Sequence, residues 1–161
     1  MQILRDPDNL AKGAALATQQ PTEHRRARVL DTAFLETRLA ERREDIEGAH
    51  RLRYRVFVEE LGAAGPFVDH ARRLERDEFD PVYDHIILVD TRIDPASLDH
   101  VVGVYRVLTG ERAEEFGRFY CDSEYDLAPL RASGKRLLEL GRSCIHSEYR
   151  GGPALHLLWA A

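Results

Sequence analysis

Three short segments of the chain place charged side chains among apolar neighbours. Arg53 lies in a run of helical character, four acids crowd into residues 75–80, and Glu139 and Arg142 interrupt an otherwise apolar run. Carboxylates take up protons or hold cations, and a guanidinium binds carboxylates through a planar fork of N–H donors. These segments are therefore the candidates for proton-transfer or charged-substrate chemistry.

Arg53 lies in the middle of a predicted apolar helix face. Each residue of an α-helix advances by about 100°, which places four apolar residues around the direction of Arg53: Ile46, Ala49, Val56 and Phe57. A guanidinium keeps its charge and is costly to bury without a partner. We therefore expect Arg53 to reach a carboxylate or a substrate anion. The alternative is a packed stem with its head in solvent.

The acidic segment 75–80 directly precedes a buried strand-like run at residues 86–89. A solvated loop is the ordinary interpretation of such a segment, but Phe79 and the following strand favour an inward position. The segment lacks the glycine and the spacing of a calcium loop, so we predict no metal. Three of its acids are candidate partners of Arg53 or of a cationic substrate group: Glu75, Asp77 and Asp80.

The run 137–146 has the character of a buried strand that Glu139 and Arg142 interrupt. Residues three apart face opposite sides of a regular strand, but a bulge at Gly141 would turn both side chains toward one side. Arg150-Gly151-Gly152 follows before a predicted helix, and backbone amides at such a turn suit a phosphate group.

Cys144 and His146 are two residues apart in the same run and would share one face of a strand. A thiol nucleophile with a histidine base is one interpretation of this pair. A buried structural cysteine is the more common use of such a position, and we favour it.

These candidates need a framework of strands and helices to bring them together. The order of the predicted elements indicates one α/β (α+β) sheet domain over residues 29–161. Residues 1–28 are predicted to be a loosely ordered arm with a short helix over 10–16. Periodicity predicts strands over 34–40, 83–90, 101–108 and 137–147, a helix over 43–61 that ends at Gly62, a loop or short helix over 63–76, an irregular aromatic stretch after 108, and a final helix that opens after Pro153.

Composition excludes several classes of protein. The 161 residues suit about one domain, and a net charge of −5 argues against a nucleic-acid binder. Two cysteines form no disulfide framework, and no apolar run approaches the ~20 residues of a membrane span. We predict a cytoplasmic protein. The basic run 24–28 is either a solubilising tail or a contact with anionic lipid, such as the inner membrane surface, or with an acidic protein.

Four motifs in order resemble those of the L-ornithine N-acyltransferases of ornithine-lipid synthesis and the related acyl-homoserine-lactone synthases, both members of the GNAT superfamily. The resemblance runs from about Leu35 to Trp159. The matching motifs are Leu52-Arg53-Tyr54-Arg55-Val56-Phe57 with Leu61-Gly62, the acids Glu75, Asp77 and Asp80, the strand arginine Arg106, and Glu139-Leu140-Gly141-Arg142.

The resemblance implies a mixed, mainly antiparallel GNAT-like sheet flanked by helices, and an enzyme that moves a 3-hydroxyacyl group onto the α-amine of ornithine. It implies Glu139 and Arg142 as catalytic residues. The implied substrate-binding residues are Arg53, Phe57, Glu75, Asp77, Asp80 and Arg106. The implied acyl-donor residues are Gly141, Ser143, Cys144, Arg150, Gly151 and Gly152.

Two departures shape the expected substrates. The lactone synthases carry tryptophan after Leu-Gly where this chain has Ala63, which weakens S-adenosylmethionine as a substrate. The usual acetyl-CoA loop has small residues where this chain has Pro153 and Leu155. We therefore expect an acyl carrier protein as the donor partner rather than CoA, and no other cofactor.

The resemblance also implies that the chain stops in the helix between the fourth and fifth GNAT strands, so that the C-terminal half of the fold is missing. We expect such a chain to be weakly active and to self-associate through an open sheet edge. Two alternatives remain: an enzyme like the lactone synthases, and a truncated interaction module without catalysis.

Overall fold

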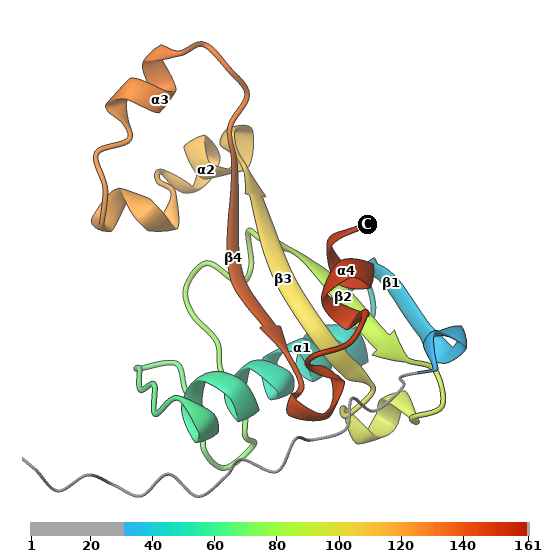
Figure 1. Ribbon diagram of the computed structural model, residues 1–161. Coiled ribbons are helices and arrows are strands. Elements are labelled where there is room, and N and C mark those ends of the chain that lie inside the picture. Colours follow the sequence, from blue (N-terminus) through green and yellow to red (C-terminus); the bar gives the residue numbers. More distant parts are fainter. Residues whose placement is uncertain (1–30, 161) are drawn as a thin grey trace, which may run out of the picture.

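The structure is a computed structural model that describes residues 31–160 (Figure 1). The arm predicted over residues 1–28 and its short helix over 10–16 lie outside the described residues, as does Ala161.

The centre of the described chain is a four-stranded antiparallel sheet whose strands neighbour one another in chain order. All four predicted strands are confirmed, with bounds that shift by at most two residues. The strands are β1 (Leu35–Leu39), β2 (Asp84–Asp90), β3 (Val101–Thr109) and β4 (Leu138–Ile145). Within residues 31–160, β1 and β4 are therefore the edge strands.

The helix predicted over residues 43–61 is α-helical only at its start. α1 spans Arg43–Arg53 and passes without a break into a π-helical segment, Tyr54–Glu60. The Leu61 amide donates to the Val56 carbonyl five residues back (3.2 Å), which is the wider π spacing. The predicted helix is thus confirmed, with a π-helical second half, and Gly62 ends it with a φ of 72° that suits glycine.

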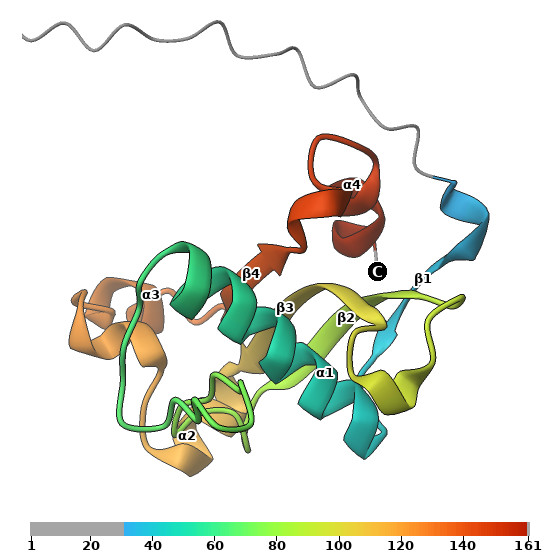
Figure 2. The ribbon, with the colours of Figure 1, turned by 90° about the horizontal axis from the view of Figure 1, so that it is seen from below.

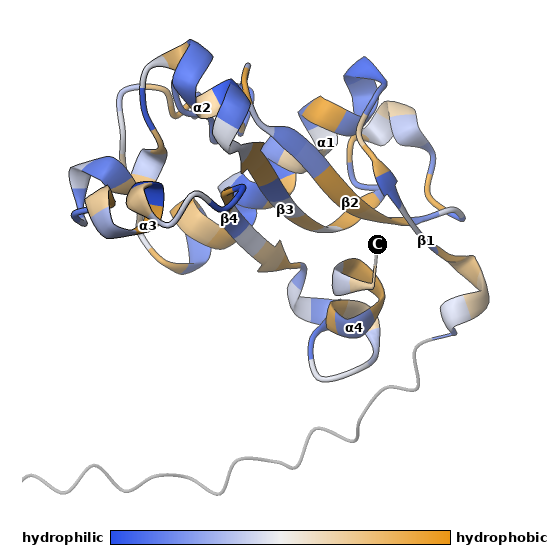
Figure 3. Ribbon diagram, turned by 90° about the horizontal axis from the view of Figure 1, so that it is seen from above, coloured by the Kyte–Doolittle hydropathy of each residue, from blue (hydrophilic) through white to orange (hydrophobic). Residues whose placement is uncertain are grey.

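α1 and α4 (Ala154–Trp159) cover opposite faces of the sheet (Figure 2). Pleating sends alternate strand residues to the two sides, so Ile87 and Val104 pack against α1, whereas Leu88 and Val102 pack beneath α4. The apolar stretches of β2 and β3 lie between these two helices (Figure 3). This arrangement is the predicted α/β class of sheet domain.

The stretch between β3 and β4 was predicted to be irregular but contains two short helices, α2 (Gly110–Phe116) and α3 (Ala128–Ala132). The Thr109 side chain accepts from the Arg112 amide at the start of α2, and Gly117 ends α2 with a φ of 105°. These caps explain why so short a segment is helical. The segment covers a third apolar cluster around Phe79, Tyr83 and Leu108.

Within residues 31–160, no helix combines the length and the apolar character needed to cross a membrane.

Candidate active site

The Arg53 side chain is fully buried and meets two carboxylates. Its Nε donates to Glu75 (2.5 Å), and its two terminal nitrogens donate to the two oxygens of Asp80 (2.5 and 3.2 Å). The prediction that a carboxylate pairs with this cation is confirmed, and the alternative of a solvent-exposed guanidinium group is wrong.

The acidic segment is shaped so that its acids point inward. The Glu75 amide donates to the His50 carbonyl of α1 (3.0 Å), which ties the segment to the helix. The Asp77 amide donates to an Asp80 oxygen (2.8 Å), and buried Phe79 anchors the turn in the third apolar cluster. A solvated loop is therefore not what the structure shows.

Six charged side chains form a closed ring in which arginines and acids alternate; we call it the charge ring. Arg106 binds Asp77 through two nitrogens (2.7 and 2.6 Å) and also reaches Asp80 (2.6 Å). Arg142 lies 3.4 Å from Glu75 and 3.1 Å from Asp77. In ring order the members are Arg53, Glu75, Arg142, Asp77, Arg106 and Asp80.

Electrostatics holds Asp77 and Asp80 in their ionised form. Burial raises the pKa of Asp80, but His85 and Arg53 lower it further, and the net pKa is far below the usual range. Burial also raises the pKa of Asp77, and Arg106 reverses that effect. With three cations and three anions the ring is neutral, which makes burial of so much charge tolerable.

A bulge in β4 gives Arg142 its place in the ring. Arg106 pairs with Gly141 while Val104 pairs with Cys144, so β4 has an extra residue at Arg142 and Ser143. Arg142 itself takes the left-handed conformation (φ 52°). The predicted bulge is thus present one residue beyond Gly141, and it brings Glu139, Arg142 and Cys144 to the α1 side.

Glu139 is held by three donors rather than by the ring. The Tyr83 hydroxyl and the Tyr120 amide (2.9 Å) donate to one oxygen, and the Cys121 amide (2.8 Å) donates to the other. Burial raises the pKa of Glu139, but hydrogen bonds from Cys121 and Tyr83 lower it overall. The carboxylate is therefore ionised at neutral pH and firmly oriented.

The residues predicted to bind the acyl donor lie in two separate places. Gly141 stands beside the ring, since a side-chain carbon there would lie 3.7 Å from Arg106 Nε. Arg150, Gly151 and Gly152 instead border a separate cavity of about 120 Å³ beyond the end of β4. Ser143 is exposed on the bulge.

Cys144 is a packing residue of the α1 side of the core. Burial raises the pKa of its thiol to about 12. β4 ends at Ile145, so His146 is outside the strand and its ring contacts Tyr149 instead. The nucleophilic pair is not supported, because the thiol stays protonated and the two residues share no strand face.

A cavity of about 310 Å³ opens beside the charge ring. Ala63–Val68 forms one wall, and Phe57 and Arg142 contribute to the other. Glu75, Arg76 and Asp77 border the same space. The cavity is therefore bordered by three of the six sequence-predicted substrate residues, Phe57, Glu75 and Asp77, while Arg53, Asp80 and Arg106 lie behind it in the charge ring.

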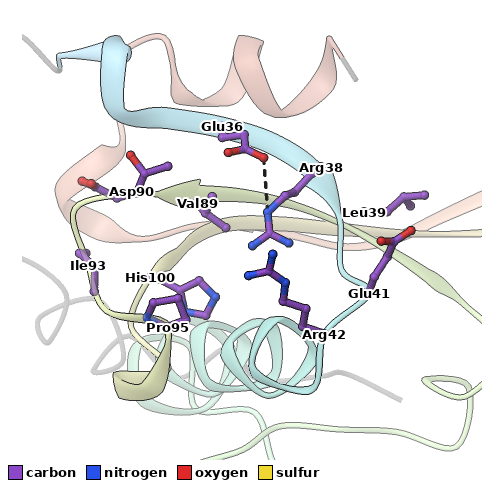
Figure 4. Close-up of a pocket in the computed structure, with 11 residues that line it drawn as sticks. Glu36, Arg38, Leu39, Glu41, Arg42, Val89, Asp90, Ile93, Pro95 and His100 are labelled. Carbon is purple, nitrogen blue, oxygen red and sulfur yellow. Dashed lines mark ion pairs between the residues drawn. The ribbon is translucent and has the colours of Figure 1, made fainter.

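A larger cavity of about 540 Å³ lies over β1 and the start of α1 (Figure 4). Arg38, Arg42 and His100 point toward it, with Asp90 at its rim. The sequence contained no signal for this cavity, because its residues come from segments that each look like ordinary surface.

His50, Asp80 and His85 offer ligand atoms within 4.8 Å of one another, which is the spacing of a metal site. Burial, reinforced by Arg53, lowers the pKa of His50 to about 3, so its imidazole is neutral. Asp80 already accepts from two guanidinium groups. A metal ion here would face these two fixed positive charges at close range, which opposes its binding.

Sequence reasoning missed Tyr83, His85 and Tyr120. Tyr83 and His85 are spaced two residues apart from Ile87 and Val89 and face the same α1 side of the sheet. This period of two was visible in the sequence. The backbone amide of Tyr120 holds Glu139 through a contact nineteen residues apart, and no local pattern could reveal it.

Comparison with known proteins agrees with this architecture. Residues 52–160 match the model of the acetyltransferase (GNAT) domain. Since the match covers more than half of the chain, the chain belongs to the GNAT acetyltransferase family. No solved structure matches the chain.

Within that family the chain is similar to proteins named L-ornithine N(alpha)-acyltransferase. It is 61% identical over 126 residues to the one from Rhodobacter capsulatus, covering 78% of this chain and 49% of that protein. For the proteins of Agrobacterium fabrum and Brucella abortus the identities are 46% and 42%, over 78% of this chain and 43% and 45% of theirs. The chain thus spans about half the length of the curated relatives it matches.

Proposed function

We propose that the chain takes part in N-acyl transfer to the α-amine of ornithine. The observation that carries the proposal is the charge ring, which borders a cavity through Glu75, Asp77 and Arg142. The ionised, oriented Glu139 is connected to the ring through Tyr83, whose hydroxyl donates to Glu139 and whose ring faces the Arg106 guanidinium. The names of the relatives supply the acceptor, because they are described as ornithine acyltransferases.

In this proposal Arg53, Arg106 and the three ring acids shape the acceptor site, and Phe57 forms its apolar wall. The amine attacks the thioester carbonyl, the C–N bond forms, and the C–S bond breaks. Glu139 takes the amine proton, directly or through a water molecule, and passes it to the departing carrier thiolate, which leaves as the thiol. A backbone amide near Gly141–Cys144 polarises the carbonyl, which suits β4 because half of an edge strand's amides point outward.

The donor in this proposal is an acyl carrier protein rather than CoA. Pro153 supports this choice because it has no amide hydrogen to offer a phosphate. Leu155 adds bulk where a phosphate loop needs small residues, and its side chain borders the small cavity with Gly151 and Gly152. The product in this proposal is a lyso-ornithine lipid, and with it we propose a cytoplasmic enzyme that contacts the inner membrane.

The test is incubation with a long-chain 3-hydroxyacyl carrier protein and ornithine, followed by mass spectrometry of N-acylornithine. Replacing Glu139→Gln removes the base while keeping its size, and we expect turnover to fall by roughly 10²-fold or more. The matched control is Glu124→Gln, an exposed residue, for which we expect unchanged turnover.

Undiminished turnover in folded Glu139→Gln would remove the base from the mechanism. A reaction with S-adenosylmethionine in place of ornithine would instead support the lactone-synthase alternative. Absence of both products in the wild type would favour a non-catalytic interaction module.

A further inference from the structure

The three arginines of the charge ring are held with different firmness. The side chains of Arg53 and Arg106 are 0% and 1% exposed, and each donates short hydrogen bonds to its acids. The Arg142 side chain is 26% exposed, and its nearest acid oxygens lie 3.1 and 3.4 Å away. Its Nε, like that of Arg106, is buried without a hydrogen-bond partner among the described residues. Arg142 is therefore the ring member that can exchange its partner most easily.

The backbone and two aromatic rings direct Arg142 to the cavity. A left-handed conformation is rare for a residue with a side chain and costs about 1 kcal/mol, and Arg142 adopts it at φ 52°. Its guanidinium carbon lies 5.3 Å from the centre of the Tyr120 ring and 5.9 Å from that of Phe57. These contacts hold the cation in position without neutralising its charge.

Arg76 borders the same cavity from the acidic segment. Its side chain makes no ion pair or hydrogen bond within residues 31–160. Because the charge ring is neutral, Arg76 leaves the cavity with one surplus positive charge. Two cations with spare donors thus border the same cavity as Asp77.

We propose that Arg142 and Arg76 form the subsite for the α-carboxylate of the amino-acid acceptor. The inference rests on the proposed function and names the feature of the acceptor that the cavity recognises. When Arg142 turns to the carboxylate, the Asp77 oxygen that it leaves accepts an ammonium group of the same molecule. Binding of the zwitterion thereby replaces the Arg142–Asp77 ion pair with two ion pairs, one between Arg142 and the carboxylate and one between Asp77 and the ammonium group. The net charge of the site does not change.

The test compares two ligands that differ only in this carboxylate, L-ornithine and 1,4-diaminobutane. Isothermal titration calorimetry of the full chain measures the affinity ratio of the two. We expect the wild type to prefer ornithine, and Arg76→Gln to reduce this preference by about 10-fold, as loss of one charge-assisted hydrogen bond does. Arg142→Lys keeps the charge but loses the fork, and we expect it to reduce the preference as well.

The matched control is Arg72→Gln, an exposed arginine of the same loop that pairs with Glu47 and does not border this cavity. We expect its preference to equal that of the wild type, which separates a specific contact from a change in net charge. In steady-state acylation, Arg76→Gln is expected to raise KM for ornithine and to leave kcat nearly unchanged.

Equal affinity of the wild type for both ligands would overturn the subsite while leaving ornithine as an acceptor. An unchanged preference in Arg76→Gln would show that Arg76 does not bind the α-carboxylate. A wild type that binds neither ligand would overturn ornithine as acceptor and the subsite with it.

Discussion

Two buried acids, Asp80 and Asp45, show how differently a protein can use the same charge. Asp80 belongs to the charge ring, where Arg53 and Arg106 bind it. Asp45 is fully buried, whereas the Asp80 side chain is 8% exposed. Asp45 is held by Arg38 and by His100 (3.0 Å). A cavity borders each cluster, so neither burial nor a nearby hollow distinguishes them.

The difference lies in the cation that faces each cavity. Arg38 and Arg142 are almost equally exposed, at 25% and 26%. Arg38 donates to both oxygens of Asp45, whereas Arg142 makes only longer contacts with its acids. The Asp45 cluster therefore fastens the start of α1 to β1 and to His100, the residue that precedes β3, while the charge ring keeps one cation available. In our proposal, the geometry of the existing ion pairs, rather than the exposure of the side chain, identifies Arg142 as the group that binds substrate.

The largest expected effect is on stability at Asp80. Asp80→Asn leaves two buried guanidinium groups without their shared carboxylate, and we expect the free energy of unfolding to fall by about 3–5 kcal/mol. For Asp45→Asn we expect about 2 kcal/mol, because Arg38 keeps access to water. Urea denaturation at neutral pH measures both.

The matched control is Asp84→Asn, which alters an exposed pair with Arg112 and should change stability by less than about 0.5 kcal/mol. Equal losses at positions 80 and 45 would show that the two clusters are energetically alike and would break the comparison.

A smaller loss of stability is expected when the pH falls, because of His50. This residue contacts the charge ring and not the Asp45 cluster. Its pKa is lowered to about 3 in the folded protein, against about 6.5 unfolded. The unfolded chain therefore binds the proton first, so stability falls as the pH drops below 6.5. From pH 6.5 to 5 we expect a loss of about 2 kcal/mol, at about 1.4 kcal/mol per pH unit.

Urea titrations across this pH range test the point when the wild type is compared with His50→Gln, whose side chain does not titrate. The variant should show a shallower dependence on pH. Identical slopes in the two proteins would assign the pH dependence to other groups.

The smallest expected effect concerns the packing under the Asp45 cluster. A side-chain carbon at Gly48 would lie 2.8 Å from Val101 and 3.1 Å from His100. Gly48→Ala gains helix propensity but pushes α1 away from β3, and we expect a net loss of about 1–2 kcal/mol. Gly65→Ala has its nearest neighbour 4.0 Å away and serves as the control in thermal unfolding. A more stable Gly48→Ala would show that α1 can shift freely.

Much of the site was predictable because a few residues obey strong physical rules. Arg53 on an apolar helix face had to meet an acid, and Glu75 and Asp80 are the acids it meets. The four strands followed from apolar runs of the right period. The bulge was anticipated from Glu139 and Arg142, which an extra residue brings to one side, and from Gly141 between them, although the structure has it one residue later.

Other features depended on contacts that no local pattern encodes. The π-helical segment after Arg53 follows from how the helix end packs, not from its propensity. The three donors to Glu139 come from residues 18 to 56 positions away in the chain. Arg76 looked like one charge in a charged run until the fold put it beside a cavity.

By itself, the sequence determined which side chains had to be buried and which charges needed partners, because burial of apolar surface and the desolvation of charge are properties of residue type and spacing. Only the tertiary structure decided that three arginines and three acids close into one ring, and that Arg142 is its loosest member. Those outcomes depend on distances of a few tenths of an ångström between segments far apart in the chain, and such distances exist only after the strands have paired.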